Sequence, residues 1–152
     1  MDTPQVADLQ TEQSMFVQNA RGVTSDGKTL RLDGVALSTL FFSDRPQRVV
    51  GQMSTIDFVN LWGEGQNSFE ADPPNAVLSF LQPGEGVPED VVIVLRDPQL
   101  GPEMLSYSFE VLEGSVPATA GPVTLFIDPF GRPLSPVSVC GVRRRERRRA
   151  RR

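Results

Sequence analysis

The chain has 152 residues, which suits a single domain, and an apolar share of 39% with nine Phe is enough to build a core. Thirteen Gly and thirteen Pro favour many turns and few long helices. Histidine is absent and Cys140 is the one cysteine, so Ser–His or Cys–His catalysis and the usual zinc and haem sites are excluded.

Charge is divided unevenly along the chain. Residues 143–152 carry eight arginines and one glutamate, a charge of +7. The preceding residues carry a charge of −11, and the two sum to the net charge of −4. A block of like charge this dense cannot bury apolar surface, so we expect a disordered tail. We also expect the polar residues 1–13 to be disordered. The predicted organisation is therefore one β-rich domain over residues 14–142 between two disordered ends.

The first half of this domain has the pattern of short strands separated by turns. Strands are expected over residues 14–20, 29–35 and 39–43, with a type I′ hairpin turn at Asp26-Gly27. One helix is expected after Ser54, because Ser54 and Asp57 resemble a capping box and apolar residues follow up to Trp62. Gly63 and Gly65 would end it.

Four further strands are expected over residues 76–81, 91–96, 105–112 and 123–128. Val91–Leu95 is apolar throughout, which is typical of a central strand buried on both faces. Seven short strands, many turns and one helix predict a mainly β fold, either an antiparallel β-sandwich or a barrel-like sheet with one short α-helix.

Residues Gly22–Thr29 satisfy G-x-x-x-x-G-K-[ST], the phosphate-binding loop of many nucleotide-binding proteins. That loop requires a buried strand before it and a helix after it. Here the preceding residues are polar, and the following TLRLDGV alternates with period two, which is typical of a strand. We therefore favour a hairpin and keep nucleotide binding as a remote alternative.

Polar residues in the expected turns form the candidate site. Aspartates at strand ends could act as a general acid and base, or could simply accept backbone hydrogen bonds in exposed turns. Arginines in the same turns could bind a carboxylate or phosphate, or could pair with the surplus acidic residues. The candidate ligand-binding or structural residues are Asp44, Arg45, Arg48, Asp72, Asn75, Arg96, Asp97, Asp128 and Arg132.

The arginine tail is a second candidate binding region. Its arginines could contact phosphates of nucleic acid or an anionic membrane surface, or could form a solvated extension. The candidate contacts are Arg143, Arg144, Arg145, Arg147, Arg148 and Arg149. No apolar run is long enough to cross a bilayer, and the first fourteen residues lack the basic residues of a signal peptide.

Five segments of the sequence are distinctive: Phe16–Ala20, Phe42–Pro46, Asp72–Ala76, Val94–Pro98 and Gly131–Leu134. Through these segments, residues 15–142 resemble an uncharacterised family of small, often exported bacterial proteins. The resemblance implies a compact domain of unknown function and supplies no catalytic residues. It also implies a periplasmic or secreted location if a signal peptide lies upstream of Met1, and a cytoplasmic one otherwise.

The function expected from these observations is a non-enzymatic β-rich domain that binds an unidentified ligand or protein partner. No cofactor and no metal site are expected, because the residues that usually hold them are missing. Binding of an anionic polymer or membrane surface through the tail is the alternative.

Overall fold

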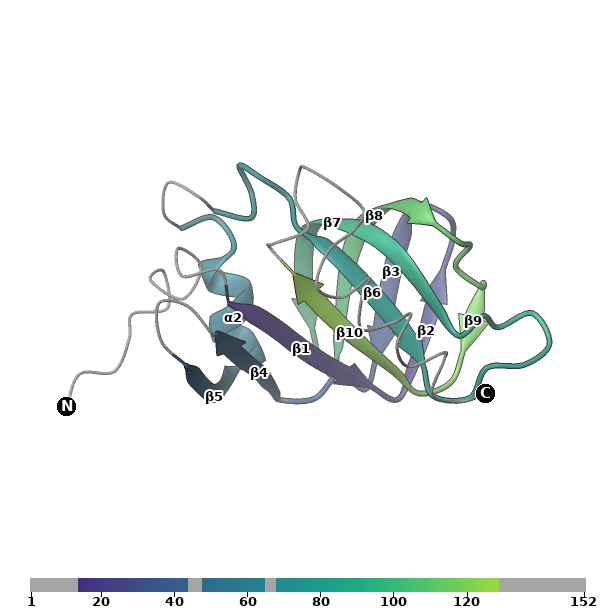
Figure 1. Ribbon diagram of the computed structural model, residues 1–152, viewed down its shortest axis with the longest axis horizontal. Helices are drawn as coiled ribbons and strands as arrows, with labels where there is room; N and C mark the ends of the chain where they lie inside the picture. The colour runs from purple at the N-terminus through teal and green to yellow at the C-terminus, as the bar shows by residue number, and fades with distance from the viewer. Residues whose placement is uncertain (1–13, 44–47, 65–67, 129–152) are drawn as a thin grey trace.

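The computed structural model describes residues 14–43, 48–64 and 68–128. Within these residues the chain forms ten strands and one helix (Figure 1). In chain order they are β1 (Met15–Ala20), β2 (Gly22–Ser25), β3 (Thr29–Asp33), β4 (Ser38–Ser43), β5 (Val49–Ser54), α2 (Thr55–Leu61), β6 (Asn75–Phe80), β7 (Asp90–Gly101), β8 (Met104–Glu113), β9 (Thr119–Ala120) and β10 (Val123–Asp128).

All ten strands join one antiparallel sheet in the order β5-β4-β1-β10-β6-β7-β8-β3-β2-β9. β1 and β2 lie six positions apart in this order, yet a single residue, Arg21, connects them. The sheet must therefore curl back on itself, as Figure 1 shows, and it does so without closing into a barrel. The prediction of a mainly β, sandwich-like or barrel-like fold with one short helix is confirmed.

The inner face of the curled sheet holds the main core. Along β3 the exposure alternates, so Leu30 and Leu32 point inward while Thr29 and Arg31 point outward. Buried apolar residues of β1, β2, β3, β6, β7, β8 and β10 belong to this cluster, and partly buried residues of β4, β5 and β9 pack against it. Phe58 and Leu61 of α2 and Trp62, which directly follows the helix, extend the cluster at one side. The largest fully buried side chains are Tyr107, Phe16, Phe58, Phe69, Leu30, Leu32, Leu61, Leu78, Ile93, Leu95, Leu105 and Leu125.

The helix is fixed by the cap that the sequence predicts. Ser54 has an extended backbone, and its hydroxyl accepts a hydrogen bond from Asp57 N at 3.0 Å. The ring of Phe58 lies 5.0 Å from that of Phe16 and 5.9 Å from that of Trp62. These three aromatic residues are buried in the core.

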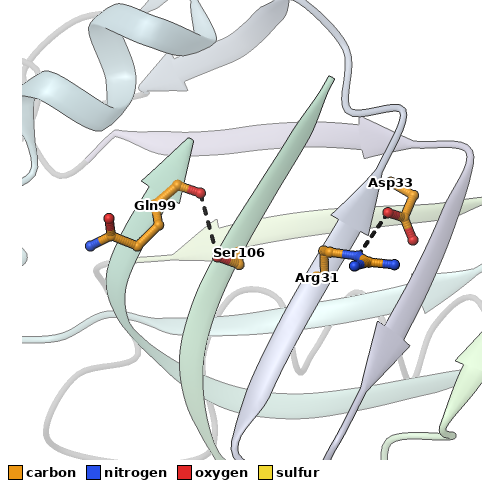
Figure 2. A network of polar contacts seen from close by, with 4 residues as sticks. All are labelled: Arg31, Asp33, Gln99 and Ser106. Carbon is orange, nitrogen blue, oxygen red and sulfur yellow. Dashed lines mark hydrogen bonds and ion pairs between the residues drawn. The ribbon is translucent and has the colours of Figure 1, made fainter. Parts of the chain in front are cut away.

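The outer face of the sheet changes character from one half to the other. On β1, β10, β6 and β7 it carries Met15, Val77 and Val92, all buried, with Phe42 of β4 and Phe126 packed against them. On β8 and β3 it carries polar residues instead. Figure 2 shows this half: Ser106 donates to the Gln99 carbonyl oxygen at 3.4 Å, and Arg31 Nε lies 2.9 Å from an Asp33 carboxylate oxygen.

Three strands were not expected from the sequence: β2, β5 and β9. The first predicted strand was expected to pair with the second across the hairpin, but β2 takes that place and β1 pairs with β10 and β4. β5 was missed because Gly51 interrupts its pattern. The glycine is needed there, since an added Cβ would lie 2.8 Å from the Phe41 ring.

The hairpin turn also differs from the expected type I′. Ser25 pairs with Leu30 and Asp26 N donates to the Thr29 carbonyl oxygen at 3.2 Å, so the central residues are Gly27 and Lys28. Among the described residues of this turn, Gly27 alone has positive φ, at 94°. Positive φ at the first central residue only is the type II′ pattern, which requires glycine there.

Candidate functional site

Four strands, β1, β4, β10 and β6, place polar residues at one end of the sheet, which lies on the left in Figure 1. β1 begins there beside the ends of β4 and β10, because Met15 pairs with Phe42 and Phe16 with Ile127. β6 begins at the same level, since Asp128 pairs with Asn75. We call this region the polar sheet end and define it by Ser14, Ser43, Asn75 and Asp128, with Arg48, Asp72, Arg96 and Asp97 around them.

The four central residues of the polar sheet end are buried on two faces. Asn75 and Asp128 alternate with inner-face residues and so lie on the outer face, where they are 9% and 0% exposed. Ser14 and Ser43 lie on the inner face and are 0% and 3% exposed. Within the described part of the chain, Ser14 Oγ is the buried side-chain polar atom without a hydrogen-bond partner. Burial is costly for a polar group that has no partner, and among these four residues this applies to Ser14 alone, because Ser43, Asn75 and Asp128 each interact with another group.

The remaining candidates reach this end from neighbouring segments. Arg48 directly precedes β5, whose Val49 pairs with Ser43. Asp72 lies in a turn that is closed by its own amide, which donates to the Ser68 carbonyl oxygen at 3.0 Å. The turn is tied to β7 because Leu95 N donates to the Pro74 carbonyl oxygen at 3.1 Å. Arg96 and Asp97 lie within β7.

Asp97 lies inside a strand rather than at its end. β7 was expected to stop at Arg96, but it continues to Gly101 through a register shift between Arg96 and Gln99. The bulge accommodates Pro98, which has no N–H to give to the ladder. Asp97 itself has φ of 53°, in the left-handed region that few residues other than glycine adopt.

Among the predicted site residues that the structure describes, Asn75 pairs with Asp128, and Arg96 and Asp97 lie on β7, the neighbour of β6; Arg48 lies apart from them, directly before β5 at the edge of the sheet. Arg96 pairs with Glu110 at 3.6 Å, and both side chains are about half exposed, so this arginine does meet a surplus acidic residue as one alternative expected. Asp128 departs from the expectation of an exposed turn residue, because it is fully buried. Asp44, Arg45, Arg132 and the tail residues 143–152 lie outside the described residues.

A buried polar chain farther along β1, at Gln18, was missed by sequence reasoning. Tyr107 Oη donates to Gln18 Oε1 at 2.8 Å, and Gln18 Nε2 donates to Thr39 Oγ1 at 3.2 Å. The Thr39 and Thr55 hydroxyls lie 3.0 Å apart, and Thr55 donates to the Ala36 carbonyl oxygen at 2.8 Å. Burial raises the pKa of the Tyr107 phenol, while its hydrogen bond to Gln18 opposes that shift.

The buried polar chain of Tyr107, Gln18, Thr39 and Thr55 links β8, β1, β4 and α2 through residues up to 89 positions apart. No local pattern could have found it; the one available clue was Gln18 and Thr39 at inward positions of predicted strands. Fully satisfied buried polar groups of this kind fix how elements pack, and we assign the network that structural role.

The phosphate-loop pattern lies in the β2–β3 hairpin. β3 follows Lys28 where a phosphate-binding loop would continue into a helix. Asp26 Oδ1 accepts from Lys28 N at 2.9 Å and Thr29 N at 2.7 Å, and these bonds lower the pKa of the Asp26 carboxyl. The two amides thus bind the chain's own carboxylate. Residues 24–26, 29 and 31 line a hollow of about 290 Å³ beside the turn.

Searches for a metal site and for a membrane span give negative results within the described residues. Residues 14–43, 48–64 and 68–128 contain no group of three or more Asp, Glu or Cys side chains placed to hold a metal ion. In the same ranges no helix has the length and apolar character needed to cross a membrane.

Comparisons with protein-family models, with curated proteins and with solved structures found no match.

Proposed function

We propose that this protein is a non-enzymatic binding domain that holds a polar ligand, or a polar segment of a protein partner, at the polar sheet end. The observation that carries the proposal is the burial of Asn75 and Asp128 there, beside Arg96 and Asp97 from a separate strand. Residues far apart in sequence meet at strand ends, and the rigid sheet fixes their positions.

The chemistry of these groups limits the ligand. Carboxylates of Asp72 and Asp97 accept hydrogen bonds, whereas the guanidiniums of Arg48 and Arg96 donate them, in most cases in pairs. A ligand that carries both donors and acceptors fits this mixture better than a purely anionic or apolar one.

A thermal-shift screen tests this proposal. Amino acids, sugars, dicarboxylates, phosphate esters and short polar peptides would be tested against the full chain and against Arg96→Gln and Asp97→Asn. The matched controls are Arg31→Gln and Asp33→Asn, which remove the same charges from an exposed pair on β3. A bound ligand should raise the melting temperature of the full chain and of both controls. Its affinity for the two site variants should be at least about tenfold lower, so that it stabilises them less.

Two results would refute the proposal. Ligands whose stabilisation is unchanged by Arg96→Gln and Asp97→Asn would move the site elsewhere. Turnover of an ester, glycan or nucleotide that disappears in Asp72→Asn, Asp97→Asn or Asp128→Asn would make the protein an enzyme.

A second candidate is polyanion binding by residues 143–152, favoured by the separation of charge along the chain. It predicts binding of a DNA duplex or of anionic vesicles that weakens steeply with salt. Deletion of residues 143–152 should abolish that binding, and equal affinity of the shortened chain would rule the tail out. The proposed location is extracytoplasmic, on the resemblance of residues 15–142 to exported bacterial proteins.

A further inference from the structure

Strand β5 (Val49–Ser54) is an open edge of the sheet. It stands at one end of the strand order and, within residues 14–43, 48–64 and 68–128, it pairs with β4 alone (Figure 1). All six of its residues pair with β4 in one unbroken register. The opposite edge is β9, which has two residues, and a strand that short offers little to a further strand. β5 is therefore the long edge of this sheet.

The hydrogen bonds between β4 and β5 show which backbone groups of β5 face away from the sheet. Thr55 N donates to the Leu37 carbonyl oxygen at 2.8 Å, and this pair continues the ladder beyond Ser38 and Ser54. Bonded and non-bonded pairs alternate in an antiparallel ladder, so every second residue counted back from Thr55 exchanges hydrogen bonds with β4. These residues are Met53, Gly51 and Val49.

Val50 and Gln52 lie between those residues, so their N–H and C=O groups point away from β4. None of these backbone groups has a hydrogen-bond partner in the part of the chain that the structure describes. Val50 is 74% exposed, and Gln52 is exposed as well. The edge therefore presents donors and acceptors at the spacing that another antiparallel strand requires.

Apolar side chains lie beside these backbone groups on the outer face of the sheet. Val50 pairs with Phe42, which packs against the buried Met15 on that face. Leu40 is the next outer-face residue of β4 and is 43% exposed. Exposed apolar surface next to unpaired backbone groups of a strand favours docking of a further strand.

We propose that β5 is the interface through which two copies of this chain associate, with the two β5 strands paired antiparallel about a twofold axis. The inference is independent of the binding proposed above. The occupant follows from the strand sequence VVGQMS, which contains no charged residue and no proline. Charges and prolines are the usual means of keeping sheet edges apart, and an uncharged strand meets its own copy without like charges opposite each other.

The strand is also complementary to itself in geometry. With Gly51 on the axis, Val50 of each copy lies opposite Gln52 of the other copy, and the residues of each such pair exchange two hydrogen bonds. Gly51 then faces its own copy in a non-bonded pair, where the absence of side chains lets the two backbones approach closely. Because the contact uses the same strand of both copies and β9 is short, association stops at two chains.

Sedimentation equilibrium of the full-length chain over about 1–300 μM tests the proposal, because an interface of one strand per copy is small and dissociates at micromolar concentration. The mean mass should rise from that of one chain towards that of two chains. Val50→Lys places a charge on the edge, and Gln52→Pro removes an outward N–H while the bonds to β4 remain. Each substitution should weaken association at least about tenfold. The matched control is Leu81→Lys, which should leave association unchanged, since Leu81 is 71% exposed directly after β6 and the substitution alters the net charge equally.

Several results would overturn the proposal. The mass of a single chain at every concentration would do so, whether the edge is free or accepts another polypeptide. Association that Leu81→Lys weakens as much as Val50→Lys would be an effect of net charge. Association that is lost when residues 143–152 are deleted would belong to the arginine tail.

If a substitution unfolds the chain, amide hydrogen exchange in the unaltered, isotopically labelled chain decides. The amides of Val50 and Gln52 should exchange about tenfold more slowly at high protein concentration than at low concentration, because they are bonded only in the dimer. The amide of Gly51, which bonds to β4, should exchange slowly at both concentrations and serves as the control within the same strand. Exchange of Val50 and Gln52 that does not depend on concentration would contradict the proposal.

Discussion

Removal of the Tyr107 hydroxyl from the buried polar chain should lower the free energy of unfolding substantially, although only one oxygen atom is lost. In Tyr107→Phe the ring still fills its place, but Gln18 Oε1 loses the donor that lies 2.8 Å away. Tyr107 is 1% exposed and Gln18 is also 1% exposed, so water cannot replace the lost donor without a rearrangement.

The cost is that of a buried acceptor left without a partner, about 1–3 kcal/mol. For a domain of this size the dependence of stability on urea is about 1–3 kcal/mol per molar, so the unfolding midpoint should fall by about 1 M. Trp62 is the one tryptophan, and its ring lies 5.7 Å from that of Tyr107, so its fluorescence reports unfolding at the site itself.

The matched control is Thr124→Val, which removes the exposed 2.8 Å hydrogen bond to Asn19 on the sheet surface. It should cost at most about 0.5 kcal/mol, because water satisfies Asn19 once the hydroxyl is gone. The reasoning is refuted if Tyr107→Phe shifts the midpoint no more than this control does. A double variant, Gln18→Leu with Tyr107→Phe, should cost less than the sum of the single substitutions, since it removes both partners.

Three further outcomes are expected. Burial raises the pKa of the Tyr107 phenol, so its contribution to the free energy of unfolding is complete below about pH 10, the pKa of an unfolded tyrosine. Above that pH the unfolded chain ionises while the folded chain does not, so the free energy of unfolding should decrease by up to about 1.4 kcal/mol per pH unit. Urea unfolding at pH 9 and pH 11 measures this decrease, which should be smaller in Tyr107→Phe. Gly51→Ala should cost about 1–3 kcal/mol because the new Cβ meets the Phe41 ring, whereas Gly84→Ala, with nothing within 4 Å, should be nearly neutral in the same urea titration. Ser54→Ala should cost about 1 kcal/mol through loss of the helix cap, and circular dichroism with urea unfolding measures it; an unchanged midpoint would contradict the cap.

Features set by neighbouring residues were predictable from the sequence. The Ser54 cap depends on a hydrogen bond three residues away, and the apolar run Val91–Leu95 identifies a central strand by composition alone. The reversal at residues 26–29 was likewise expected, although its central pair was placed one residue early. In each of these cases the local structure depends on residues only a few positions apart in the sequence.

Features set by distant residues were not predictable. The Tyr107–Gln18 bond spans 89 positions, and the place of β10 between β1 and β6 follows from packing rather than from any local pattern. Asp72 lies in a turn as the sequence indicates, but Asp97 lies inside β7, and the pairing of Asn75 with Asp128 depends on strand order. The full burial of Asp128 could not be foreseen, because a strand-closing aspartate in one sequence is in most cases an exposed turn residue.

The place of β10 is the point on which the polar sheet end depends, since it sets Asp128 beside Asn75 and joins β1 to β6. Cross-strand nuclear Overhauser effects in the isotopically labelled full-length chain measure it directly. We expect contacts from Leu125 to Gln18 on one side and to Leu78 on the other. Contacts between β1 and β3 across a hairpin, with β10 at an edge of the sheet, would contradict the account.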